Sequence, residues 1–210
     1  MIKLNLNTKL FFLTKICIIC IICFIVSLKS YAEDLGAQSN MVVIGSNDAT
    51  VKIKIFSSLT CPHCANFHIN IVPKIKKEYI ESGKAQLIFI DFPLDQAAFN
   101  ASKLLHCLDQ NKQIIFLDTI YETQNKWTSG SNINEINNNL KKMVQILGIS
   151  SIQFDKCLND EIIADKILNG RIDGHQKYSI NSTPTIIINE KKLEGSASFK
   201  NIKKKIEKLI

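Results

Sequence analysis

The stretch FSSLTCPHCANFH, residues 56–68, decides how the rest of this sequence is interpreted. Its two cysteines, Cys61 and Cys64, are separated only by Pro62 and His63, and the pair follows a strongly apolar run. Cysteines at this spacing serve three kinds of chemistry, namely a metal site, covalent haem attachment and thiol–disulfide exchange. The residues around the motif distinguish between them.

Neither metal nor haem suits the sequence. Structural zinc usually takes its Cys and His ligands as two closely spaced pairs, but Cys107 and Cys157 lie far from the motif and from each other. Haem attachment needs a histidine directly after the second cysteine, and Ala65 occupies that position. We therefore expect no metal and no cofactor, only a redox-active disulfide between Cys61 and Cys64.

The flanking patterns place Cys61 at the start of a helix. Residues 50–58 alternate apolar and polar side chains, which predicts a strand. Apolar residues then recur at helical spacing from Cys61 until Gly83 ends the helix. Pro73 falls inside this helix and is expected to kink it.

A helix start favours redox chemistry at the cysteines. Free backbone N–H groups and the positive end of the helix dipole stabilise a thiolate, the reactive form of Cys61. Pro62 suits the first turn, and His63 can add a positive charge or a hydrogen-bond donor beside the sulfur. Cys64 lies one turn on, within disulfide reach. A stabilised Cys61 thiolate makes the disulfide an oxidant of other thiols, whereas a purely structural disulfide is the alternative.

The whole chain predicts an α/β fold in which a helical block interrupts one sheet. Residues 95–177 have helical patterns throughout, and residues 112–127 are expected to form one of these helices. Strands are predicted at residues 40–46, 50–58, 85–94, 183–190 and 191–195, with a closing helix at 198–210. The expected domains are therefore a sheet-containing α/β one from residues 33–94 and 178–210, and an inserted all-helical one from residues 95–177.

The N-terminal residues 1–32 have the pattern of a secretory signal peptide. Lysines precede an apolar run at residues 16–28, and Ser30 and Ala32 are placed as in a cleavage site. The apolar run is shorter than the about 20 residues that a membrane span needs. Cleavage after Ala32 is expected, and an uncleaved membrane anchor remains the alternative because Lys29 follows the run.

Export affects how the net charge and the cysteines of the mature chain are interpreted. Four of the 26 basic residues precede residue 33, which leaves 22 basic and 19 acidic residues, with Arg171 the only arginine. This composition argues against a nucleic-acid partner. In an oxidising compartment disulfides persist, so Cys107 and Cys157 are candidates for a structural disulfide within the helical block, with two free buried thiols as the alternative.

From about Met41 onward the sequence resembles the DsbA-like family of thioredoxin-fold thiol:disulfide oxidoreductases. The resemblance rests on FSSLTCPHCANFH, on LIFIDFPL, on CL at Cys157 and on STPTIIINEKKLEGS. It implies that Pro184 forms a cis peptide bond against the cysteine pair, and that Thr183 and Pro184 border a groove where substrate peptide binds in extended form. An ordinary trans-proline opening a strand is the alternative.

The resemblance also implies an activity and partners. Unfolded exported proteins with free thiols would receive the disulfide in the periplasm, and a DsbB-like membrane protein would reoxidise the enzyme. Only about nine residues separate Ala32 from Met41, which leaves no room for a dimerisation domain and favours a monomeric oxidase. The rival functions are a disulfide isomerase or reductase, a non-catalytic holdase, and an assembly factor that delivers thiols to a metal site.

Two features depart from the family pattern. Ile55 stands where a buried acid is common, and Ser58 where an aspartate is common, which puts the proton route for the second thiol in doubt. The remaining histidines, His68, His106 and His175, are expected at helix surfaces or boundaries. The basic C-terminal stretch is expected to be a solvated helix face.

Overall fold

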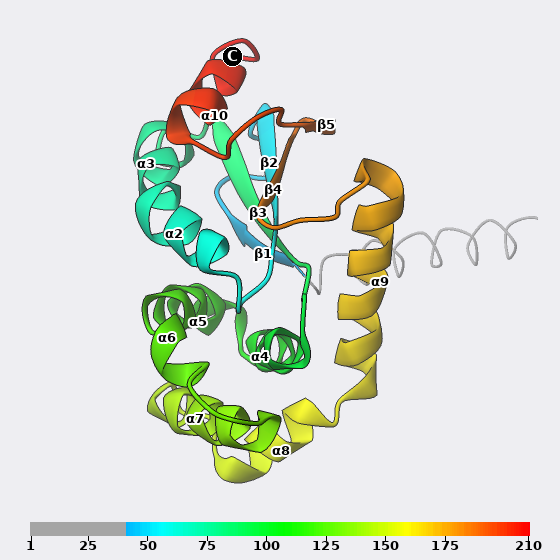
Figure 1. Ribbon diagram of the computed structural model, residues 1–210. Coiled ribbons are helices and arrows are strands. Elements are labelled where there is room, and N and C mark those ends of the chain that lie inside the picture. The colour runs from blue at the N-terminus through cyan, green and yellow to red at the C-terminus, as the bar shows by residue number, and fades with distance from the viewer. Residues whose placement is uncertain (1–40) are drawn as a thin grey trace, which may run out of the picture. The chain divides into compact units, whose positions relative to one another are not determined.

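The structure, a computed structural model, describes residues 41–210 (Figure 1). The predicted signal peptide and its membrane-anchor alternative lie outside the described residues. Within residues 41–210 no helix combines the length and the apolar character that crossing a membrane requires.

A five-stranded sheet forms the centre of the fold, in the order β1-β3-β2-β4-β5. Its strands are β1 (Met41–Ile44), β2 (Val51–Ser57), β3 (Ala85–Asp91), β4 (Thr185–Ile188) and β5 (Lys191–Lys192). The central strand β2 runs parallel to β3 and antiparallel to β4. The outer strands β1 and β5 pair antiparallel with β3 and β4. The two halves of the chain therefore complete one sheet, as predicted.

Helices cover both sides of this sheet (Figure 1). On one side lie α2 (Pro62–Asn70), α3 (Val72–Ile75), the π-helical turn η2 (Lys76–Ile80) and α10 (Phe199–Ile206). On the other side α9 (Glu161–Tyr178) packs against β3. Gly174 of α9 approaches the sheet so closely that an added Cβ would lie 2.6 Å from the Phe56 ring.

The segment between β3 and β4 is helical. Its helices are α4 (Gln96–Cys107), α5 (Gln110–Glu122), α6 (Gln124–Trp127), α7 (Ile133–Ile146), α8 (Ser151–Leu158) and α9. This arrangement confirms the predicted fold class, a thioredoxin fold with helices inserted between the two halves of the sheet. The domain boundaries at residues 94/95 and 177/178 stay predictions.

Two predicted helices are interrupted. The helix after Cys61 stops at Asn70 and resumes as α3, because Pro73 has no N–H to donate to the carbonyl four residues earlier and fits only a first turn. The kink expected at Pro73 is thus confirmed. The helix predicted at residues 112–127 divides into α5 and α6 at Thr123, which was not expected.

The lysines of β2 lie on the face opposite Val51, Ile53 and Ile55. Lys54 contacts the carboxylate of Glu190 and donates to the Tyr178 hydroxyl at 3.1 Å. Lys52 donates to the backbone oxygen of Asn47 at 2.5 Å. Both ammonium groups are therefore paired while their stems cover the sheet, which explains how two lysines fit a central strand.

Candidate active site

Cys61 lies in the short loop between the end of β2 at Ser57 and the start of α2 at Pro62. Cys61 is the N-cap residue of α2, with φ −77° and ψ 119°, and Pro62 occupies the first turn. Its backbone oxygen accepts hydrogen bonds from the backbone N–H groups of Cys64 at 3.0 Å and Ala65 at 3.1 Å. The Cys61 side chain therefore sits at the positive end of the helix, as the sequence predicts.

The two sulfurs differ in environment. Both cysteines are free thiols, so the structure describes the reduced pair. Cys61 is 8 % exposed and Cys64 only 1 %. Burial raises the pKa of the Cys64 thiol to about 12, and the neighbouring Cys61 adds to the shift, whereas an interaction with the Thr183 side chain opposes it. Cys64 is thus held as a protonated thiol, and Cys61 is the sulfur nearer the surface.

The loop before β4 faces the cysteine pair. The peptide bond between Thr183 and Pro184 is cis. The Cys61 thiol donates a hydrogen bond to the backbone oxygen of Thr183 at 3.4 Å. Pro184 lines a narrow crevice together with Cys64. The structure therefore brings Cys61, Cys64, Thr183 and Pro184 together from segments about 120 residues apart, since Cys61 and Thr183 are separated by 122 positions.

The other predicted site residues lie on the surface or elsewhere. Pro62 and His63 are exposed beside the pair. Cys107 and Cys157 form a disulfide between α4 and α8, with a Cα–Cα distance of 5.9 Å. This second pair belongs to the helical segment.

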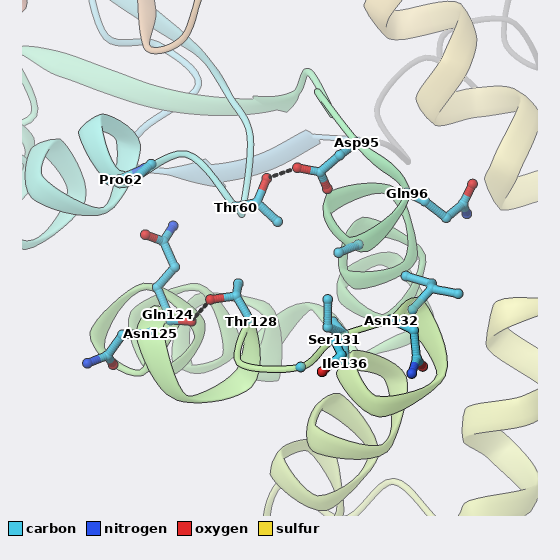
Figure 2. Close-up of a pocket in the computed structure, with 13 residues that line it drawn as sticks. Thr60, Pro62, Asp95, Gln96, Gln124, Asn125, Thr128, Ser131, Asn132 and Ile136 are labelled. Atoms are coloured by element: carbon cyan, nitrogen blue, oxygen red, sulfur yellow. Dashed lines mark hydrogen bonds between the residues drawn. The ribbon is translucent and has the colours of Figure 1, made fainter.

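A groove opens beside the start of α2 (Figure 2). Its volume is about 670 Å³, and its lining comes from the loop after β2 and from α4, α6 and α7. Thr60 donates to Asp95 at 2.6 Å across one end of it. Asp95 is the only charged residue in the lining. The groove therefore offers mainly uncharged polar and apolar side chains next to Pro62.

Gln124 supports the cysteine loop from α6, at the wall of this groove (Figure 2). Its side-chain N–H group donates to the backbone oxygens of Leu59 at 2.8 Å and Cys61 at 3.1 Å. No sequence pattern marks Gln124, because a lone glutamine in a helical stretch carries no signal. Only the packing of α6 against the loop identifies it.

The prediction for two histidines was wrong. His68 is 6 % exposed, and its Nε2 atom lies 2.7 Å from an Asp118 carboxylate oxygen. The His106 side chain is 2 % exposed and contacts the Asp91 carboxylate. Both imidazoles can be buried because a carboxylate partners each one. His175 is exposed, as expected.

The position common for a buried acid holds no acid. Ile55 is buried and lines the crevice behind Cys64. The Ser58 hydroxyl lies 3.1 Å from the Thr60 hydroxyl, and the Ser58 backbone interacts with the Cys64 thiol. Among residues 41–210, no three His, Cys, Asp or Glu side chains gather as a metal site would require.

Comparison with known proteins agrees with this geometry. Residues 37–208 match the family described as Thioredoxin. A probable disulfide bond formation protein D of Bacillus anthracis is 30% identical over 86% of this chain and 83% of its own. A putative protein-disulfide oxidoreductase of Rickettsia bellii is 27% identical over 87% of this chain and 70% of its own.

Solved structures give the same result. The crystal structure of Wolbachia pipientis alpha-DsbA1 has a TM-score of 0.73 and 31% identity, covering 81% of this chain and 90% of that chain. Oxidised BdbD from Bacillus subtilis has a TM-score of 0.67 and 25% identity, covering 80% and 92%. With the CPHC motif at a helix start and the cis-proline against it, the chain belongs to the DsbA-like thiol:disulfide oxidoreductases of the thioredoxin family.

Proposed function

We propose that this protein is an exported dithiol oxidase that donates the disulfide between Cys61 and Cys64 to folding proteins. The observation that carries the proposal is the asymmetry of the pair. Cys61 lies at a helix N-terminus beside the Thr183 carbonyl, and Cys64 is buried behind it with its pKa raised to about 12. The helix start stabilises a Cys61 thiolate, which favours the reduced enzyme and makes the disulfide easy to donate.

The reaction would proceed through a mixed disulfide. A substrate thiolate attacks the Cys61 sulfur, the bond between the two enzyme sulfurs breaks, and Cys64 leaves with the electron pair and takes up a proton. A second substrate thiolate attacks the substrate sulfur in the mixed disulfide and releases Cys61 as a thiolate. The substrate loses two electrons and gains a disulfide, and the enzyme is reduced.

The groups around Cys61 suit an extended peptide. In the reduced form the Thr183 carbonyl accepts a hydrogen bond from the Cys61 thiol. This carbonyl is a backbone group two residues before the start of β4 at Thr185. Peptide backbone can pair with such a group while a substrate cysteine approaches Cys61. Unfolded proteins with free thiols are therefore the proposed substrates, bound at Thr183 and Pro184.

The proposed location is the periplasm, reached through the signal peptide at residues 1–32. The disulfide between Cys107 and Cys157 supports an oxidising compartment, because such bonds seldom persist in the cytosol. Each turnover leaves reduced enzyme, so a reoxidising partner is required. A DsbB-like membrane protein is proposed for that role, and a monomer is the proposed state.

The test is disulfide transfer to a reduced, unfolded protein with two cysteines. The oxidised chain from residue 33 onward should oxidise about one equivalent of substrate. Cys61→Ser should abolish transfer. Cys64→Ser, offered a substrate in disulfide form, should instead accumulate a mixed disulfide through Cys61.

An isomerase would give a different result. Faster rearrangement of a scrambled test protein than oxidation of a reduced one would contradict the oxidase proposal. Retention of function in Cys61→Ser would contradict thiol chemistry altogether and favour the holdase.

A further inference from the structure

The proposed reaction imposes a proton problem at Cys64. This thiol is 1 % exposed and its pKa is raised to about 12, so it must take up a proton whenever it leaves and lose one whenever it attacks. Because water does not reach it, the proton has to pass through side chains. Ile55 cannot carry it, since it has no titratable group.

The crevice behind Cys64 brings three polar side chains to the sulfur. Ser57, His68 and Tyr121 line it with Cys64, and apolar side chains complete its wall. The crevice is too narrow to hold a water molecule. Any proton that crosses it must therefore move directly between these groups.

Two polar atoms at this crevice make no hydrogen bond of ordinary geometry among residues 41–210. They are the Nδ1 atom of His68 and the hydroxyl of Tyr121, and both are buried. Their rings lie close, with centroids 4.8 Å apart. Buried polar groups are nearly always hydrogen-bonded, so two without such a bond next to a buried thiol call for an explanation.

Tyr121 also responds to the cysteines electrostatically. Burial raises the pKa of Tyr121 well above the usual value, with the charge of Cys64 as the next cause, whereas an interaction with the Ser57 side chain opposes the shift, so the hydroxyl remains protonated. A protonated hydroxyl can accept from the Cys64 thiol and donate to an imidazole lone pair, or donate to a Cys64 thiolate and accept from an imidazole N–H.

The opposite side of His68 reaches solvent. Its Nε2 atom lies 2.7 Å from Asp118, whose side chain is 51% exposed. A carboxylate only accepts hydrogen bonds, so Nε2 carries the proton and Nδ1 has the lone pair. His68 also lines a surface groove of about 350 Å³ together with Lys76, Glu81 and Glu122. The imidazole thus lies between the narrow crevice and the surface groove.

We propose that His68 is the proton relay between the Cys64 thiol and solvent, with the Tyr121 hydroxyl as the bridge across the crevice. The proposal rests on the proposed thiol–disulfide reaction. In this proposal a histidine of α2 and a tyrosine of α5 transfer the proton to and from Cys64. Ile55, at the position where a buried acid is common, has no group that could do so.

The proton balance closes over one catalytic cycle. On reoxidation, Cys61 is joined to a sulfur of the oxidising disulfide, and Cys64 passes its proton through Tyr121 to Nδ1 of His68. The oxidant's second sulfur leaves as a thiolate when Cys61 is joined to the first. Nε2 releases its proton past Asp118, and the Cys64 thiolate attacks the Cys61 sulfur and displaces the oxidant's first sulfur as a thiolate. On oxidation of a substrate, Nδ1 returns a proton to the leaving Cys64 thiolate while Nε2 takes one from solvent.

The groups that face His68 set the pH range of this relay. Burial lowers the pKa of the imidazole, Asp118 and Glu122 of α5 raise it, and Lys76 of η2 lowers it. Glu81 shares the groove, and Cys64 and Tyr121 share the crevice. With burial the largest cause, His68 is neutral near neutral pH and can accept the Cys64 proton.

The experiment measures how fast Cys64 resolves a mixed disulfide on Cys61. Reduced protein is mixed with oxidised glutathione, quenched with acid, and the internal disulfide is quantified by mass across a range of pH. We expect His68→Gln to slow this step by about tenfold or more near neutral pH and to remove the inflection that His68 gives the profile.

The matched control is His106→Gln, which breaks the other buried pair of imidazole and carboxylate. It should affect folding stability in a similar way but keep the wild-type rate and pH profile. A folded His68→Gln protein with the wild-type rate and profile would overturn the relay. Should His68→Gln not fold, Tyr121→Phe decides, since it removes only the hydroxyl: a slowed step supports the relay and a wild-type rate overturns it. Wild-type protein that forms no internal disulfide would instead refute the proposed function.

Discussion

Two pairs of cysteines within residues 41–210 occupy opposite ends of helices. Cys61 is the N-cap of α2, with Cys64 in its first turn. Cys107 is the last residue of α4, and Cys157 lies in the last turn of α8. Burial alone does not distinguish the two pairs. In the second pair Cys107 is exposed but Cys157 is as buried as the cysteines of the first pair.

The helix ends give the two pairs opposite electrostatics. The N-terminus of a helix stabilises a thiolate, and the C-terminus, with its free carbonyl groups, disfavours one. A disulfide whose reduced form contains a stabilised thiolate is easily reduced, and one without that stabilisation resists reduction. The comparison therefore supports the proposal that Cys61 and Cys64 exchange electrons, whereas Cys107 and Cys157 cross-link the chain.

The largest expected effect comes from removing the cross-link. Replacing both Cys107 and Cys157 by alanine should lower the free energy of unfolding by about 4 kcal/mol, because the bond closes a loop of 50 residues. Denaturant unfolding measures the loss. Disulfide transfer by the folded variant should match the wild type, and a folded variant that lost transfer would place the second pair in the redox chemistry.

The next effect is a pH dependence of the reduced protein. The pKa of the Cys64 thiol rises from 9.0 to about 12 on folding, so the folded state keeps a proton that the unfolded state has lost. Stability from this group is complete below about pH 9 and falls by about 1.4 kcal/mol per pH unit above it.

Cys64→Ala supplies the reference for that measurement. The reduced wild type and the variant should diverge as the pH rises past about 9, with the wild type losing stability faster. Parallel curves in denaturant unfolding would show that Cys64 is not the buried thiol described here.

A smaller effect tests how the helical segment supports the active pair. Gln124→Ala removes the donor to the carbonyls of Leu59 and Cys61, which should cost about 1 kcal/mol and slow disulfide transfer. Asn125→Ala, exposed in the same groove, is the control and should change neither quantity. Equal stability and equal transfer rates in the two variants would show that Gln124 does not support the Cys61 loop.

Features written in short stretches of sequence could be predicted. The alternation before Cys61, the helix after it and the interruption at Pro73 depend on neighbouring residues alone. The position of Thr183 and Pro184 against the cysteines came from family resemblance, since no local pattern joins residues 122 positions apart.

Features that depend on how helices pack could not be predicted. The sequence around His68 predicts a surface histidine, because its partner Asp118 comes from α5. The sequence around Gln124 predicts an ordinary helical residue, because its contact with the Cys61 loop depends on how α6 packs. The division at Thr123 was also missed, because no proline or glycine marks it.

The most direct test of the contrast between the two pairs is equilibrium with a glutathione buffer of graded ratio. Thiols are trapped by alkylation, and each disulfide is quantified by mass after proteolysis. The account predicts that the disulfide between Cys61 and Cys64 opens at mildly reducing ratios while the one between Cys107 and Cys157 stays closed. Equal resistance of both pairs, or earlier opening of the second, would contradict it.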